Sequence, residues 1–200
     1  MTTEGGKFNG RVTSGRRSGR RAVLLLSFAS VFVAAALVAN ADARPRDGRV
    51  PASARVSGIP ALREQVLMAI NDLRRSKGLP GLKLNTALSL AALGHSRSMA
   101  EHGFFSHDGW NGSAFWTRLK PRYRPQRGKQ WAVGENMVWA SPNLSANQAI
   151  QMWLDSPPHR KNLLASEWRE VGLGAVRALA ARGVYHGLDV TILTADFGIR

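Results

Sequence analysis

The chain has 200 residues, of which 44% are hydrophobic and 20% are charged, with a formal net charge of +15 and no cysteine. This length suits one domain of ordinary size plus a tail, and the apolar content excludes a chain that is disordered throughout. The lack of cysteine excludes a disulfide framework, a zinc ribbon, an iron–sulfur cluster and a thiol nucleophile.

The N-terminal part has the pattern of an export signal over residues 1–43. Its first 21 residues hold six basic residues and one acid, and an apolar run follows over residues 22–39. Small residues then offer cleavage sites after Ala41 or Ala43, so we predict a secretory signal peptide. The alternative is an uncleaved anchor with a membrane contact through residues 22–39, because about 18 apolar residues can just span a bilayer. Both interpretations predict an exported protein that is periplasmic, extracellular or anchored facing outward.

The segment after the signal is predicted to be a flexible linker over residues 44–58, because it is rich in Arg, Pro, Gly and Ser. One folded domain is predicted over residues 59–200. The chain after residue 43 carries 22 basic and 11 acidic residues, a net charge of +11. The exported part is therefore strongly basic by itself.

Two helices are predicted at the start of the domain. The first begins at Pro60, a favourable residue in a first helical turn, and ends at Gly78. Asn85 is predicted to cap a second helix that runs to about His102. We expect His95, on the apolar face of this helix, to be a core histidine with a satisfied hydrogen bond rather than a ligand.

A short helix is predicted over residues 113–119, and a basic stretch follows it. The stretch contains no acid between its first and last cations, and its members are Arg118, Lys120, Arg122, Arg124, Arg127 and Lys129. In the cytoplasm such a patch would indicate nucleic acid, but outside the inner membrane the expected partners are anionic lipid, glycan or another envelope component. A solvated loop that binds nothing specific is the alternative.

The C-terminal half is predicted to hold two further helical segments and two strands. Ser145 caps a helix that stops at residues 156–158, because proline cannot continue it, and one or two turns follow over residues 159–164. Residues 171–176 and 190–197 have the composition of strands. Helices therefore dominate the first part and strands the last, which predicts an α+β class with helices packed on a small sheet.

Four local strings give the domain a family resemblance. They are AALGHSRSMA at 91–100, FSH at 105–107, GENM at 134–137 and WLDSPPHRKNLL at 153–164. In this order and spacing they resemble the CAP superfamily, the SCP-like extracellular domains of bacterial type, over about residues 60–198. The resemblance implies an α/β/α sandwich, a small and mainly antiparallel sheet covered by helices, with a central cleft.

The resemblance also implies the residues that line this cleft. It makes His107 the first cleft histidine, Glu135 the glutamate of the GEN motif and His159 the second histidine. Better-studied eukaryotic members have a second glutamate three residues after the helix tryptophan, where this chain has Ser156, with Asp155 one residue earlier. This departure leaves a site of two histidines and one glutamate.

The chemistry of this trio suits zinc or another divalent cation, because imidazole and carboxylate are common ligands of such ions. His107, His159 and Glu135 are therefore the candidate metal ligands as well as the candidate ligand-binding residues. We expect Gly134 to present Glu135 through a tight turn, since glycine tolerates positive φ. No residue is assigned as catalytic.

Three functions are consistent with the sequence. The first is a non-catalytic binding module for a lipid, a glycan or an envelope partner, with the divalent-metal cleft as an optional part. The second is a metal-dependent hydrolase, a peptidase or esterase, in which a bound cation activates water. The third is a structural envelope protein with a vestigial cleft. We expect the binding module, because the chain lacks an HExxH helix and a G-x-S-x-G turn.

Overall fold

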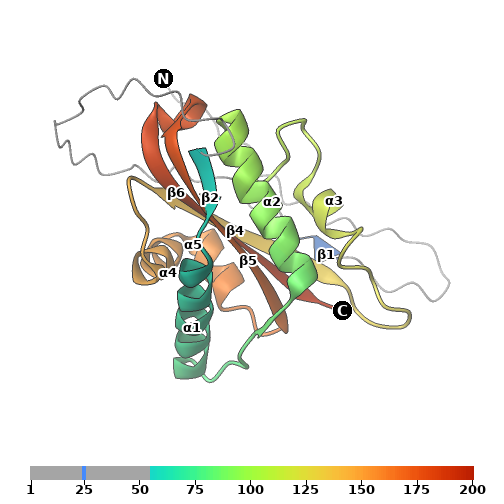
Figure 1. Cartoon of the computed structure of the whole chain (residues 1–200). Coiled ribbons are helices and arrows are strands. Elements are labelled where there is room, and N and C mark those ends of the chain that lie inside the picture. The colour runs from blue at the N-terminus through green and yellow to red at the C-terminus, as the bar shows by residue number, and fades with distance from the viewer. Residues whose placement is uncertain (1–23, 26–54) are drawn as a thin grey trace, which may run out of the picture.

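The computed structural model describes residues 24–25 and 55–200 (Figure 1). The helices are α1 (Pro60–Ser76), α2 (Thr86–His102), α3 (Phe115–Leu119), α4 (Ala146–Asp155), α5 (Pro157–Leu163) and the short 3₁₀ helix η2 (Gly183–Tyr185). The strands are β1 (Leu24–Leu25), β2 (Val56–Gly58), β3 (Lys83–Leu84), β4 (Ala132–Ala140), β5 (Glu170–Ala181) and β6 (Leu188–Ile199). Apart from β1, the predicted export signal lies outside the described residues. Across the described residues, none of the helices combines the length and the apolar character needed to span a membrane.

The predicted ends of α2 and the predicted start of α4 are confirmed by local caps. Two other helices begin elsewhere than predicted: α3 begins at Phe115 instead of residue 113, and α5 begins at Pro157 instead of residue 159, because proline suits a first helical turn. The Asn85 side chain accepts a hydrogen bond from the Leu88 amide at 3.1 Å, and Gly103 ends α2 at a φ of 71°. At the start of α4, Ser145 and Gln148 form a reciprocal capping box. These caps fix where α2 and α4 begin.

The sheet is built around three long antiparallel strands in the order β4, β6, β5. β2 pairs antiparallel with the outer edge of β5, whereas β1 and β3 add short parallel pairings to β4 and β5. The two predicted strands are confirmed but extend further at both ends. β4 was not predicted, because the polar pair Glu135 and Asn136 interrupts its apolar pattern.

The end of the predicted linker is structured. Residues 56–58 form β2, where Ser57 lies opposite Arg177 of β5. The Ile59 amide continues the contact by donating to the Ala175 carbonyl at 3.0 Å. Backbone pairing with a sheet edge needs no apolar side chains, so composition did not reveal this strand.

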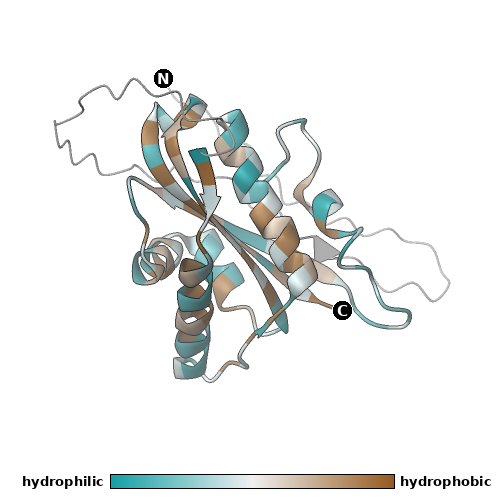
Figure 2. Ribbon diagram, in the orientation of Figure 1, coloured by the Kyte–Doolittle hydropathy of each residue, from teal (hydrophilic) through white to brown (hydrophobic). Residues whose placement is uncertain are grey.

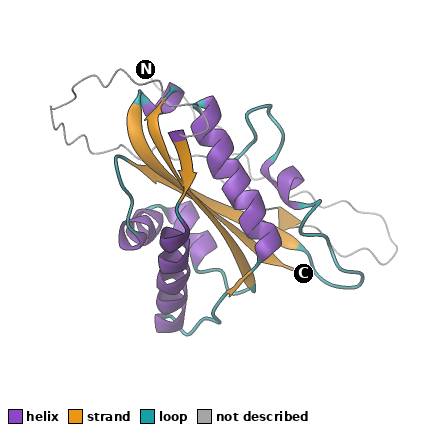
Figure 3. Cartoon of the chain, in the orientation of Figure 1, coloured by secondary structure: helices purple, strands orange, loops and turns teal. Residues whose placement is uncertain are grey.

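Helices cover both faces of the sheet, as the α/β/α prediction requires (Figure 3). One face packs against α1, α4 and α5 through a large core that includes Val66, Trp153 and Phe197. The other face packs against α2 and α3 through two smaller clusters. Two glycines of β5, Gly172 and Gly174, allow the α2 backbone to approach so closely that a Cβ at either position would overlap it.

Candidate functional site

Two acidic side chains lie side by side in the middle of the sheet. Glu135 of β4 is directly opposite Asp196 of β6 in the strand register. Since side chains alternate along a strand, Glu135 shares a face with Val133 and Met137, which pack against the α2 and α3 side. Glu135 is 4% exposed and Asp196 is 0% exposed. Carboxylates buried to this degree need compensating groups.

His107 supplies the first of these groups. It lies in the loop after α2, and its Nδ1 is 2.7 Å from Glu135 Oε1. A carboxylate only accepts hydrogen bonds, so Nδ1 carries the hydrogen and the lone pair of the neutral ring is on Nε2. Burial, and then the charge of Arg118, lower the pKa of His107 to about 4. The imidazole is therefore neutral at pH 7.

Arg118 of α3 supplies the second group. Its Nη2 forms an ion pair with Glu135 Oε2 and lies 3.9 Å from Asp196 Oδ1. Its Nη1 donates to the His107 carbonyl at 2.8 Å. From the sequence, Arg118 was predicted to contact an anionic surface as part of the basic stretch. That prediction is wrong for Arg118, because its side chain is paired with a buried carboxylate. The side chain is drawn inward by two buried carboxylates and is only 19% exposed.

Asp196 was missed as a site residue. Both of its carboxylate oxygens are buried without a hydrogen bond among the described residues. Burial raises the pKa of Asp196 to about 7, although Arg118 and His107 act in the opposite direction. The signal in the sequence was an aspartate inside an otherwise apolar central strand, where a lone charge has a large desolvation cost.

His159 enters the site from the opposite layer, on α5. Its ring centroid is 6.5 Å from that of His107. The Asn136 side chain donates to the His159 carbonyl at 3.0 Å, and Asn162 in turn donates to Asn136 at 3.0 Å. The asparagine of the GEN motif thus joins α5 to β4. Burial, followed by the neighbouring His107, lowers the pKa of His159 to about 4, so this ring is also neutral at pH 7.

The three predicted cleft residues are therefore brought together from a loop, a strand and a helix. Residues 67–190, more than half of the chain, match the family described as CAP, the cysteine-rich secretory protein family. The chain belongs to the CAP family. Its sequence contains no cysteine, despite the family's descriptive name.

Two curated relatives of the CAP domain come from Bacillus subtilis (strain 168). The uncharacterized membrane protein YlbC is 32% identical over 114 residues, which cover 57% of this chain and 31% of YlbC. The uncharacterized protein YkwD is 24% identical over 127 residues, which cover 61% of this chain and 45% of YkwD. The chain thus spans less than half the length of these relatives.

Solved CAP structures have the same architecture. An extracellular protein containing an SCP domain from Bacillus anthracis is 26% identical with a TM-score of 0.54, covering 70% of this chain and 41% of that one. An outer surface protein from Borrelia burgdorferi has a TM-score of 0.56 at 18% identity, covering 72% of this chain and 98% of that one. At 18% identity, the similarity to the Borrelia protein supports a shared fold and nothing further.

Better-studied CAP members have a second glutamate at the position of Ser156, and in this chain neither Ser156 nor the preceding Asp155 supplies a carboxylate to the site. Asp155 lies on the exposed surface of α4, where its Oδ1 accepts a hydrogen bond from Gln151 at 2.7 Å. Ser156 is buried, and its hydroxyl has no hydrogen-bond partner among the described residues. Asp196, from a different strand, is the second acid of the site.

The predicted trio does not have the arrangement of a metal site. Glu135 already has a cation, because Arg118 holds Oε2 while His107 holds Oε1. Over residues 55–200, no group of three or more His, Cys, Asp or Glu side chains is arranged to hold a metal ion. The residues present therefore fit a guanidinium better than a divalent ion.

Gly134 has a different role from the predicted one. It is not among the residues with positive φ, so the predicted tight turn is wrong. Instead, a Cβ at this position would lie 2.6 Å from Asn162 Oδ1 and 2.9 Å from the Trp168 ring. The absence of a side chain allows α5 to approach β4, and this approach brings His159 to the cleft.

The remaining cations of the basic stretch are exposed. They lie in the hydrophilic loop between α3 and β4 (Figure 2) and are Lys120, Arg122, Arg124, Arg127 and Lys129. Tyr123 in the same loop is buried, and its hydroxyl donates to Glu170 while its carbonyl accepts from Trp131 at 2.8 Å. The loop is thus anchored at its middle, and its five cationic residues are exposed.

Proposed function

We propose that this CAP domain is an exported, non-catalytic binding module whose cleft takes an uncharged polar group through His107 and His159. The single observation that carries this proposal is the closed Glu135–His107–Arg118 arrangement. It leaves His107 neutral and leaves neither Glu135 nor Asp196 accessible as a base. The His159 ring nearby is also neutral, because burial lowers its pKa to about 4.

The chemistry of neutral imidazoles defines the expected ligand. A neutral ring offers one donor and one acceptor nitrogen. His107 Nδ1 is committed to Glu135, so Nε2 remains as an acceptor, while the His159 ring has no hydrogen bond within the described residues. Hydroxyl and amide groups match this pair, and envelope glycans are rich in both. A glycan is therefore our first choice of ligand.

Export is part of the same proposal. The N-terminal sequence pattern supports it, and the similar Bacillus proteins are described as a membrane protein and as an extracellular protein. The exposed cations of the α3–β4 loop could add a contact to anionic lipid or another anionic envelope component. That second contact stays a prediction.

A lipid ligand is the second candidate, and the place we propose for it is a groove of mixed polar and apolar lining. The groove lies between α1 and α4 and has a volume of about 640 Å³. Its lining is formed by Gln65, Met68, Ala69, Asp72, Ser145, Ala146, Asn147, Ile150 and Gln151. None of the cleft residues contributes to it. Lipid bound there would survive changes in the cleft and would be lost on Asn147→Trp, which adds bulk to the groove.

A metal-dependent hydrolase is less well supported. It requires Glu135 to exchange its guanidinium partner for a metal ion that activates water. Removing one partner from a buried ion pair leaves the other charge unpaired, which is strongly unfavourable. A hydrolase would thus require Arg118 to move away from Glu135, whereas a binding module requires no such rearrangement.

The experiment is an array of envelope-type oligosaccharides probed with the full chain, followed by titration calorimetry on the best binder. We expect His107→Ala and His159→Ala each to weaken binding about tenfold or more, because each removes one hydrogen bond to the ligand. The matched control is His186→Asn, which changes an exposed histidine at positive φ that asparagine tolerates. Glycan binding that is unaffected by both alanine variants would contradict the proposal.

A further inference from the structure

The cluster of predicted cleft residues contains a cation that belongs to the chain itself, the guanidinium of Arg118. We infer that the guanidinium of Arg118 occupies the position of a divalent ion in this CAP site. Its positive charge therefore prevents metal ions from binding there. The inference goes beyond the proposed ligand class, since it concerns what the cleft excludes.

The first argument is that both oxygens of Glu135 are occupied. Oε1 accepts from His107 Nδ1 at 2.7 Å, and Oε2 forms the ion pair with Arg118 Nη2. A metal ion bound to Glu135 would have to displace one of these groups. It would also be repelled by the fixed positive charge of Arg118 beside it.

The second argument is that one nitrogen faces both buried acids. Arg118 Nη2 is paired with Glu135 and is 3.9 Å from Asp196 Oδ1. Neither Asp196 oxygen has a hydrogen bond among the described residues, so the guanidinium supplies the positive charge that faces them. Carboxylates also suit divalent ions, so the guanidinium occupies a position between side chains that could otherwise attract such an ion.

The third argument is that the guanidinium is held in place. Nη1 donates to the His107 carbonyl at 2.8 Å, and the guanidinium carbon lies 5.8 Å from the centre of the Phe115 ring. Swinging Arg118 out would leave the buried Glu135 carboxylate without its counter-charge. A metal ion therefore cannot enter by simple displacement of a mobile side chain.

The inference predicts that removal of this guanidinium creates a metal site. Arg118→Met keeps similar side-chain bulk but leaves Glu135 and Asp196 without their cation, next to His107. The test is calorimetric titration of the full chain with Zn²⁺ and Co²⁺, with the visible absorption spectrum of Co²⁺ as a second readout. We expect Arg118→Met to bind at least about tenfold more tightly than the wild type, with Co²⁺ absorption that is absent in the double variant Arg118→Met/Glu135→Gln.

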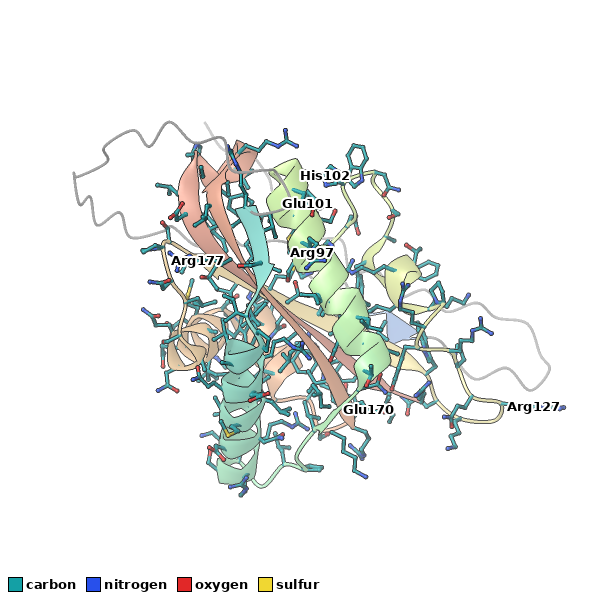
Figure 4. The ribbon with its side chains drawn as sticks, viewed as in Figure 1. Arg97, Glu101, His102, Arg127, Glu170 and Arg177 are labelled. Atoms are coloured by element: carbon teal, nitrogen blue, oxygen red, sulfur yellow. The ribbon has the colours of Figure 1, made fainter. Side chains whose placement is uncertain are left out.

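Two controls separate the charge of Arg118 from general effects. Arg118→Lys retains a positive charge and is expected to exclude metal as the wild type does. Arg97→Met removes one positive charge from the exposed face of α2 (Figure 4), and is expected to leave metal binding unchanged. If Arg118→Met needs metal to fold, the near-ultraviolet circular dichroism of the native chain should return on adding Zn²⁺.

The inference would be overturned by wild-type Zn²⁺ binding that is lost in Glu135→Gln. It would also be overturned by an Arg118→Met variant that binds no more metal than the wild type, or that stays unfolded at saturating Zn²⁺. These outcomes are independent of the glycan experiment, which can fail or succeed without changing them.

Discussion

His95 shows how one buried side chain makes the stability of the domain depend on pH. It is 3% exposed on α2, and its Nε2 donates to the Ser106 carbonyl at 2.9 Å. Burial, then the charge of Arg118, lower its pKa from 6.5 to about 3. As the pH falls below 6.5 the unfolded chain binds a proton and the native chain does not. The contribution of neutral His95 is therefore complete above about pH 6.5 and is lost as the pH falls toward 3.

A variant at this position should isolate the effect. We expect His95→Gln, which cannot titrate but can still donate to Ser106, to lose less free energy of unfolding between pH 7 and pH 4.5 than the wild type, by about 2 kcal/mol. Urea denaturation at the two pH values measures the difference. An identical pH dependence in both proteins would show that His95 is not buried neutral.

The site residues divide into those that motifs reveal and those that only the fold reveals. His107, Glu135 and His159 were predicted because each belongs to a string typical of CAP domains. Arg118 looked like one more cation of a basic loop, and the sequence contains nothing that separates it from its neighbours. Its role depends on the direction of α3 over the sheet, which is a tertiary property.

At the scale of elements, Gly134 controls how closely α5 approaches β4. We expect Gly134→Ala to lower the free energy of unfolding by about 1–3 kcal/mol, because its Cβ would overlap Asn162 and Trp168. Gly94→Ala is the matched control. Gly94 lies in α2 with no atom within 4 Å of an added Cβ, so this change should be neutral or stabilising by up to about 1 kcal/mol.

Thermal and urea denaturation of the two variants provide the comparison. If Gly134→Ala is as stable as Gly94→Ala, the close approach of α5 to β4 is not a requirement of the fold. A destabilised Gly134→Ala should also bind the cleft ligand less well, since α5 carries His159.

Elements were predictable wherever local rules decide them. The ends of α2 and α4 follow from caps and prolines that lie next to them in the sequence. β4 was missed because its central residues, Glu135 and Asn136, serve the cleft and the α5 contact rather than a core. β2 was missed because it forms through backbone hydrogen bonds with β5, which leave no pattern in its side chains. In both cases tertiary contacts overrode the local pattern.

At the scale of the whole molecule, the site residues come together only where the two helical layers meet β4. The loop of His107 and the helix of Arg118 belong to one layer, and the helix of His159 belongs to the other (Figure 1). β4 lies between them and contributes Glu135. The separations of these residues along the chain carry no local signature, so the site could not be derived from spacing without the family resemblance.

The most direct test of this account is a long-range ¹H–¹⁵N NMR spectrum of the imidazoles in the full chain at pH 7. The account predicts neutral rings for His107 and His159, with the His107 hydrogen on Nδ1 and an unprotonated Nε2. Assignment follows from His107→Ala and His159→Ala. A doubly protonated His107, or a His107 ring with its hydrogen on Nε2, would contradict the Glu135–His107 contact from which the proposed function is built.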